Sequence, residues 1–272
     1  MTVKLVAVDM DGTFLNECKT YNKARFLAQY AELTARGIRF VVASGNQYYQ
    51  LISFFPEIRD DIAFVAENGA WVVDRGETLF CGEFSRQQVL AVLDELLPLS
   101  DVTTVLCGKQ SAWLPEDAPA SAVATLARHY HRLTPVADLR QVEDRLFKVA
   151  LTLPEAQSAR LRAALGHRLD GIVTPVASGF GFVDLIIPGL HKASGLRRLQ
   201  QQWQINDEEV LAFGDSGNDA EMLRQAGYSF AMANARPDVA DLARFRAGDH
   251  NAEAVLDVID DLLAGRGVFA AG

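Results

Sequence analysis

A short apolar run near the start of the chain ends in two acidic residues: Lys4-Leu5-Val6-Ala7-Val8-Asp9-Met10-Asp11-Gly12-Thr13. The crowded Val and Leu side chains predict a buried strand over residues 4–8. Side chains two residues apart in extended chain point the same way, so we expect the carboxylates of Asp9 and Asp11 on one side. One carboxylate can attack phosphorus, while a second can protonate a leaving oxygen and then activate water. Taken alone, however, an acidic turn after a strand is also a common structural feature.

Strands and helices alternate on either side of the middle third of the chain. Residues 22–36 have apolar positions at helical spacing and end at Gly37, which predicts an amphipathic helix. Residues 38–43, 62–66 and 210–213 are predicted as further buried strands. This alternation indicates a parallel sheet with helices on both faces, where ligands bind beyond the carboxyl ends of the strands. Asp9, Ser44 and Glu67 are expected at such ends.

The pattern changes near Phe84 and returns at His191. We therefore predict an α/β fold with a Rossmann-like parallel-sheet core, residues 1–83 and 188–272, and an inserted α/β cap domain, residues 84–187. In the cap, Ser85 is expected to begin a helix, and Ser178-Gly179-Phe180-Gly181 to turn a hairpin. The other cap elements are predicted as helices at 86–97, 118–132 and 155–165 and strands at 102–107 and 147–153, with the hairpin over 172–187.

A second acidic strand end is Gly214-Asp215-Ser216-Gly217-Asn218-Asp219. Oxygen ligands, including one or two carboxylates, suit a hard cation such as magnesium. The stretch lacks the spacing and the final Glu of an EF-hand loop. Since it is the second acidic strand end in one chain, a plain solvated turn is the weaker interpretation.

Ser44 and Lys192 complete the candidate set. Ser44 could donate to a phosphate oxygen together with the main-chain N–H groups that follow it. Lys192 would open a helix and offer a compact positive charge. Individually, each residue type at such a place is more often plain surface.

Composition excludes several classes of function. The 272 residues carry a net charge of −9, which disfavours a nucleic-acid surface. No apolar run approaches the roughly 20 residues that cross a bilayer, and no secretory leader pattern is seen. The cysteines, Cys18, Cys81 and Cys107, match no metal or redox motif and are expected to be reduced. We expect a soluble cytoplasmic protein that acts on small phosphorylated molecules, with no nucleic-acid, membrane or obligate protein partner.

Taken together and in this order, these motifs resemble the haloacid dehalogenase superfamily along the whole chain. Within it, the sequence resembles the Cof-type sugar phosphatases, and most closely the bacterial YbiV/SupH-like enzymes. The stretches that carry the closer resemblance are Thr13–Asn16, Val42–Leu51, Ala66–Ala70, Ser178–Phe182 and Asp184–Lys192.

The resemblance implies a role for each matching residue. Asp9 would be the nucleophile that forms an aspartyl-phosphate, and Asp11 the general acid and base. The cofactor would be magnesium, bound by Asp9, Asp11 and Asp215, with Asp219 supporting the metal or its waters. The residues expected to hold the phosphoryl group are Ser44, Gly45, Lys192 and Asn218.

Substrate choice is expected to involve Asn46 and the cap. Many relatives have Arg where this chain has Asn46, so a contact made by that Arg is not expected here. Gly179 permits close approach to a ligand, and Phe180 offers an apolar face to a sugar ring. An ordinary hairpin turn, with Phe180 packed in the cap, is an equal alternative.

Two alternative functions would use the same residues. A phosphoryl transferase or mutase would return the group to a sugar instead of to water. A non-enzymatic phosphate-binding module would hold it as a signal, but an acid and base two residues from the nucleophile argues against this.

Overall fold

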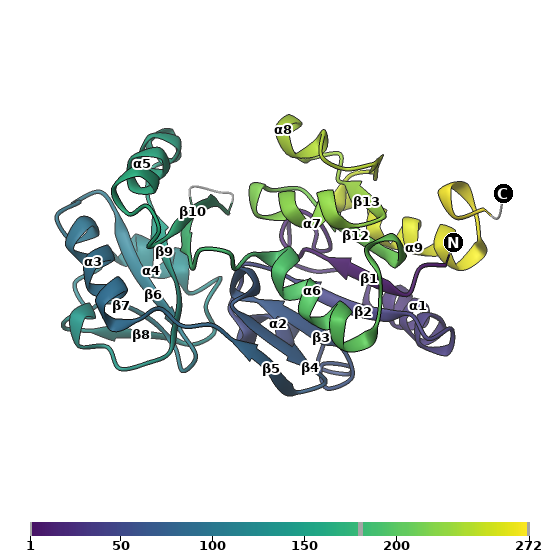
Figure 1. Cartoon of the computed structure of the whole chain (residues 1–272), viewed down its shortest axis with the longest axis horizontal. Helices are drawn as coiled ribbons and strands as arrows, with labels where there is room; N and C mark the ends of the chain where they lie inside the picture. The colour runs from purple at the N-terminus through teal and green to yellow at the C-terminus, as the bar shows by residue number, and fades with distance from the viewer. Residues whose placement is uncertain (1, 179–181, 271–272) are drawn as a thin grey trace. The chain divides into compact units, whose positions relative to one another are not determined.

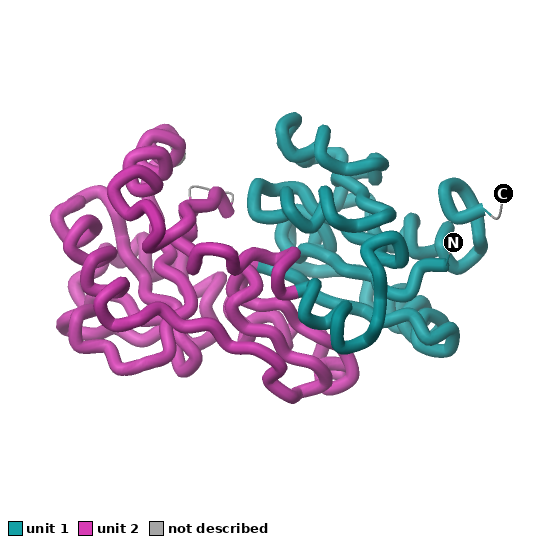
Figure 2. The backbone as a smooth tube through the Cα atoms, in the orientation of Figure 1, with its two compact units in different colours: residues 1–44, 196–272 teal, residues 45–195 magenta. Residues whose placement is uncertain are grey.

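The computed structural model describes residues 2–178 and 182–270 of the chain (Figure 1). The chain divides into two compact units (Figure 2). The first comprises Met1–Ser44 and Leu196–Gly272, and the second Gly45–Gly195. No helix in the described ranges combines the length and the apolar character that a membrane span requires.

The first unit is built on parallel strands, as the alternating pattern predicts. β14, β13, β12, β1 and β2 lie side by side in that order. The strands β1 and β12 are buried along their whole length, which is the pattern of a parallel sheet covered on both faces. The bounds are β1 (Leu5–Val8), β2 (Arg39–Ala43), β12 (Val210–Gly214), β13 (Tyr228–Ala231) and β14 (Phe245–Arg246).

The first helix of the first unit begins where the sequence predicts. The side chain of Asn22 accepts the N–H of Arg25 and so begins α1 (Lys23–Ala35). The guanidinium of Arg25 pairs with Glu253, Asp257 and Asp260, which joins α1 to α9. The remaining helices are α7 (Ala220–Gln225), α8 (Pro237–Ala240) and α9 (Ala254–Ala264); α6 (Lys192–Trp203) contains the boundary between the units.

The second unit contains three antiparallel strands, β3, β4 and β5. Only the first of them, at residues 62–66, was predicted from the sequence. β3 pairs with β4, and β4 with β5. Arg75 and Gly76, both at positive φ, turn the chain between β4 and β5. The helix α2 ends before Pro56 and precedes them. The bounds are α2 (Tyr48–Phe54), β3 (Ala63–Ala66), β4 (Trp71–Asp74) and β5 (Glu77–Cys81).

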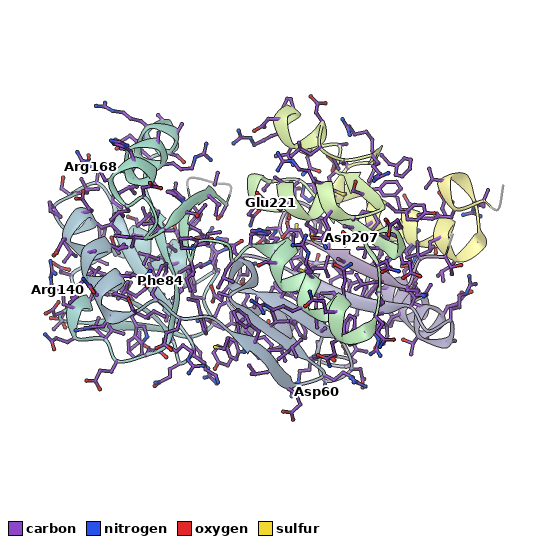
Figure 3. The ribbon with its side chains drawn as sticks, viewed as in Figure 1. Asp60, Phe84, Arg140, Arg168, Asp207 and Glu221 are labelled. Atoms are coloured by element: carbon purple, nitrogen blue, oxygen red, sulfur yellow. The ribbon has the colours of Figure 1, made fainter. Side chains whose placement is uncertain are left out.

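A six-stranded sheet occupies the rest of the second unit, in the order β10-β11-β9-β6-β7-β8. Phe84 lies inside its apolar core, whereas Arg140 and Arg168 extend from its surface (Figure 3). A Ser85–Gln88 capping box begins α3, which confirms the predicted helix start. The bounds are α3 (Arg86–Leu96), β6 (Thr103–Gly108), β7 (Ala112–Pro115), α4 (Ala120–Leu126), β8 (Leu133–Val136), β9 (Leu146–Thr152), α5 (Glu155–Arg168), β10 (Thr174–Ala177) and β11 (Phe182–Ile186).

The predicted helix over residues 118–132 is wrong in its second half, because α4 ends at Leu126. The side chain of Gln47 bonds both main-chain groups of Arg132, accepting its N–H at 2.9 Å and donating to its carbonyl oxygen at 2.8 Å. Gln50 Nε2 donates to the carbonyl oxygen of Arg128 at 2.8 Å. Hydrogen bonds from a distant segment thus fix this stretch outside the helix.

The predicted hairpin over residues 172–187 is present, since β10 and β11 pair antiparallel. Its candidate turn residues, Gly179 and Phe180, lie outside the described residues. The proposed limits of the cap, residues 84–187, stay a prediction, because the compact unit that contains this segment also includes residues 45–83.

A left-handed turn follows β3. Glu67, Asn68 and Gly69 have φ values of 51°, 54° and 90°. A methyl group on Gly69 would lie 2.3 Å from the carbonyl oxygen of His191, just before α6. Only glycine therefore fits both the conformation and the space at this position.

We expect Gly69→Ala to destabilise the protein more than Gly171→Ala does. Both glycines have positive φ, which costs an alanine about 1–2 kcal/mol, but a methyl group on Gly171 would meet no atom within 4 Å. The clash at Gly69 should add about 1–3 kcal/mol. Denaturant unfolding of both variants measures the difference, and equal losses would contradict the steric argument.

Candidate active site

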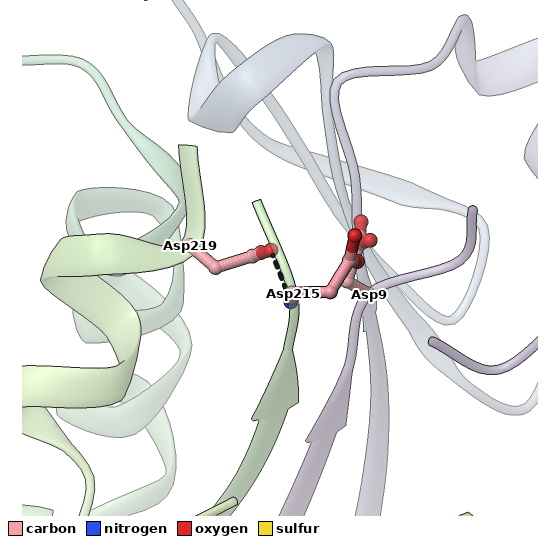
Figure 4. A group of neighbouring side chains, drawn as sticks. All are labelled: Asp9, Asp215 and Asp219. Atoms are coloured by element: carbon pink, nitrogen blue, oxygen red, sulfur yellow. Dashed lines mark hydrogen bonds between the residues drawn. The ribbon is translucent and has the colours of Figure 1, made fainter. Parts of the chain in front are cut away.

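Three aspartates converge at the carboxyl edge of the parallel sheet. β1 and β12 are neighbours with Val8 opposite Phe213, so the residues that follow them reach the same edge. Oxygens of Asp9, Asp215 and Asp219 all lie within 4.8 Å of one another (Figure 4). Asp9 is 5% exposed and Asp219 fully buried. The structure thus brings together three of the predicted site residues from positions about 200 apart in the sequence.

Two glycines make room for these carboxylates. Gly12 has a φ of +78°, and a methyl group there would lie 2.8 Å from Asp215 Oδ2. A methyl group on Gly214 would lie 2.5 Å from the side-chain Cγ of Asp219. Each acidic turn therefore depends on a glycine that faces a carboxylate.

Hydrogen bonds separate the roles of Asp215 and Asp219. Asp219 Oδ2 accepts the main-chain N–H groups of Asp215 and Ser216, at 3.0 and 2.9 Å, so this carboxylate fixes the loop itself. Asp215 Oδ1 accepts from Thr13 Oγ1 at 2.8 Å, which ties the two acidic turns together. The side chain of Asp215 is thereby oriented at the edge that it shares with Asp9.

The donor set fits a hard divalent cation. Burying several carboxylates together is costly, because each loses water and repels the others. A magnesium ion offsets this repulsion and prefers oxygen ligands of this kind. Asp9 and Asp215 are the residues best placed to hold it, with Asp219 behind them.

Asp11 lies on the loop after Asp9 and is partly exposed. Lys19 pairs with its carboxylate through Nζ, a partner that the sequence analysis did not identify. Polar side chains anchor the same loop: Asn234 Nδ2 donates to Gly12 O at 2.8 Å, and His250 Nδ1 lies 2.7 Å from Leu15 O. The loop that carries the predicted acid and base is therefore held from the other end of the chain.

The predicted phosphate-binding residues lie at element ends in both units. Ser44, 2% exposed, follows β2, and Asn218, 8% exposed, lies in the 3-10 turn Gly217–Asp219 of the first unit. Gly45 and Asn46 begin the second unit. Lys192, 1% exposed, is the first residue of α6 in that unit.

A buried charge cluster in the second unit was missed by the sequence analysis. We use this name for Glu67, Lys148 and Asp184, which are each 1–3% exposed. Lys148 Nζ lies 3.3 Å from Glu67 Oε2 and 3.1 Å from Asp184 Oδ2, and Asn68 Nδ2 donates to Asp184 Oδ2 at 2.7 Å. Lys148 falls inside an apolar run predicted as an ordinary strand, and a lysine within such a run is the signal that could have revealed the cluster.

The cluster perturbs its own protonation. Burial raises the pKa of Glu67 to about 7, although the ammonium of Lys148 opposes that shift. Burial would lower the pKa of Lys148, but the carboxylates of Asp184 and Glu67 outweigh it and raise that pKa. With Glu67 protonated, the remaining Lys148–Asp184 pair is neutral, which is the less costly state inside a protein.

Comparison with known proteins identifies the family of the chain. The sequence model of the haloacid dehalogenase-like hydrolase family matches residues 6–259 of the chain. The chain belongs to this family. This hydrolase is 52% identical, over 97% of both chains, to 5-amino-6-(5-phospho-D-ribitylamino)uracil phosphatase YbjI of Escherichia coli (strain K12).

Two further relatives extend the comparison. HMP-PP phosphatase of Cronobacter sakazakii is 28% identical over 87% of this hydrolase and 86% of the relative. The crystal structure of SMU.1108c from Streptococcus mutans UA159 superimposes with a TM-score of 0.93 at 36% identity, covering 97% of this chain and all of that one. The predicted family and the α/β fold with a parallel-sheet core are thereby confirmed.

We expect Glu67 to lower the free energy of unfolding as the pH rises from about 4.5 to about 7. In this window the folded protein holds the Glu67 proton that the unfolded chain has released, because the folded pKa is the higher one. Glu67→Gln mimics the protonated form. It should therefore abolish the decrease in the free energy of unfolding that Glu67 causes, which is on the order of 1–3 kcal/mol. Denaturant unfolding at several pH values, with the exposed Glu77→Gln as control, measures the slope. Identical slopes for the parent and Glu67→Gln would contradict this assignment.

Proposed function

We propose that the chain is a magnesium-dependent phosphatase that hydrolyses small phosphorylated metabolites through an aspartyl-phosphate on Asp9. The observation that carries the proposal is the convergence of Asp9 and Asp215, with Asp219 behind them, at two neighbouring strand ends. Membership of a hydrolase family and the phosphatase names of the relatives support it.

The chemistry follows from where the two carboxylates of the first turn lie. Asp9, buried at the sheet edge, would attack phosphorus while the bond to the leaving oxygen breaks. Asp11, on the exposed loop, would give that oxygen a proton and then take one from the water that cleaves the acyl phosphate. Lys19 pairs with the Asp11 carboxylate, so this exposed partner would move away before Asp11 donates a proton.

Magnesium, when bound, would supply positive charge against the phosphate oxygens. We assign its ligands to Asp9, Asp215 and the main-chain carbonyl of Asp11, with Asp219 fixing the loop. The residues proposed to hold the phosphoryl group are Ser44, Gly45, Lys192 and Asn218.

The proposed substrate is a phosphorylated sugar or sugar alcohol. The E. coli relative is named for a ribityl phosphate, in which a sugar-alcohol chain carries the phosphate, and 52% identity over nearly the whole chain makes this compound the first to test. A panel of sugar phosphates and 5-amino-6-(5-phospho-D-ribitylamino)uracil, with released phosphate as the readout, ranks the candidates by kcat/KM. The absence of phosphate release from the whole panel would overturn the proposal.

Activity should require a divalent cation. The buried carboxylates of Asp9 and Asp215 would otherwise repel a phosphate dianion. We expect phosphate release to stop in excess chelator and to return when magnesium is added. Calorimetry should also show that Asp215→Asn binds magnesium more weakly than the parent. Full turnover in chelator would contradict the metal assignment.

The two carboxylates of the first turn should differ in their effects. Asp9→Asn removes the attacking charge and keeps the shape, so kcat should fall by about 10⁴ or more. Asp11→Asn should slow hydrolysis of sugar phosphates more than that of an aryl phosphate, whose leaving group needs less protonation. The exposed Asp170→Asn serves as control and should keep parental rates. Equal losses on both substrates for Asp11→Asn would contradict its role as the acid.

A further inference from the structure

The buried charge cluster also contacts the loop that follows Ser44. Besides its two carboxylate partners, Lys148 Nζ donates to the main-chain carbonyl oxygen of Gly45. The loop is 103 residues away in the sequence, and its own residues carry no charge. One buried ammonium thus joins β9, β11, the turn after β3 and this loop.

A second contact from the same cluster fixes the next peptide of the loop, between Asn46 and Gln47. The main-chain N–H of Glu67 donates to the carbonyl oxygen of Asn46 at 3.2 Å. Glu67 makes this contact from the left-handed turn Glu67–Gly69, a conformation that costs energy in non-glycine residues and persists only where its surroundings enforce it. The side chain of Asn68, in the same turn, is held by Asp184.

These two contacts determine the direction in which the main-chain N–H groups of the loop point. In a planar trans peptide the C=O and the N–H point in opposite directions. Since the carbonyl of Gly45 points at Lys148 and that of Asn46 at Glu67, the N–H groups of Asn46 and Gln47 point away from the cluster. The cluster therefore determines which way the loop presents its main-chain donors.

We propose that Lys148 is a positioning residue for phosphate binding. From within the buried charge cluster it fixes the peptide between Gly45 and Asn46, so that the loop after Ser44 offers its main-chain donors to the substrate's phosphate. This rests on the proposed function, in which Gly45 belongs to the phosphate-binding set. Lys148 itself is 3% exposed and acts through the loop.

The energetics favour a positioning role over a stabilising one. A buried lysine with two carboxylates adds little stability compared with apolar side chains of similar size, because all three lose their water. Glu67 Oε2 is buried without a well-oriented hydrogen bond, so the cluster is not fully satisfied even with its lysine. What the ammonium provides that an apolar side chain cannot is a donor to Gly45.

The test compares variants that keep the fold. Lys148→Met alone leaves two buried carboxylates unpaired and is expected to unfold readily. The triple variant Lys148→Met/Glu67→Gln/Asp184→Asn keeps the shapes without the charges and should stay folded. Lys109→Met is the control for loss of a lysine from the second unit, where the ammonium of Lys109 lies over the ring of Trp71.

Inorganic phosphate, with magnesium present, is the probe, and calorimetry and competitive inhibition measure its affinity. Losing one oriented donor to a charged group should weaken phosphate binding by about tenfold or more in the triple variant. The value of kcat/KM should fall by the same factor on an aryl phosphate and on sugar phosphates, since all share the phosphate. Lys109→Met should bind phosphate as the parent does.

Two outcomes overturn the inference. If the folded triple variant binds phosphate as tightly as the parent does, the cluster has only a packing role. If kcat/KM falls only for sugar phosphates, the cluster acts in recognition of the sugar. If the unmodified protein neither binds nor releases phosphate, the proposed function fails as well, so the two failures are distinguishable.

Discussion

The parallel pairing of β1 with β12 is the constraint on which the candidate site depends. Because the two strands run in register and end together, the turns that follow them meet at one edge, although they are about 200 residues apart in the sequence. Gly12 and Gly214 leave space for the carboxylates that face them. The resulting concentration of negative charge is unfavourable by itself, and a bound cation would relieve it. The proposed need for a cation is therefore a consequence of the strand pairing that brings the two acidic turns together.

Charge is handled differently in the second unit. There, the ammonium of Lys148 is provided by the protein, so two carboxylates can be buried without a metal. The cluster supports the left-handed turn after β3 and the loop that follows Ser44. Such buried ions add little stability, and here the ammonium joins three segments through Glu67, Asp184 and Gly45. The cluster accordingly lies where segments far apart in the sequence must keep fixed orientations.

Strand ends carried most of the predictive information about the site. Asp9, Asp215 and Asp219 follow apolar runs, and the geometry of a parallel sheet then places them together. Lys19 and Asp184 carried no comparable signal, and Lys148 was marked only as a lysine within an apolar run, since the roles of all three come from partners on other elements. The second half of the helix predicted at residues 118–132 failed for the same reason: Gln47 accepts the N–H of Arg132 and Gln50 donates to the carbonyl oxygen of Arg128, two groups that the helix would have paired with each other.

The sequence by itself determined the family, the parallel-sheet core and the acidic residues at its edge, because these depend on local patterns: apolar runs, turn glycines and the residues just after a strand. Only the tertiary structure decided which charges are buried and what they touch. Lys148 has the same apolar neighbours along the chain as any core strand residue, and its partners lie 36, 81 and 103 positions away. Burial and long-range hydrogen bonding depend on how strands from distant segments are ordered in a sheet, which no local pattern encodes.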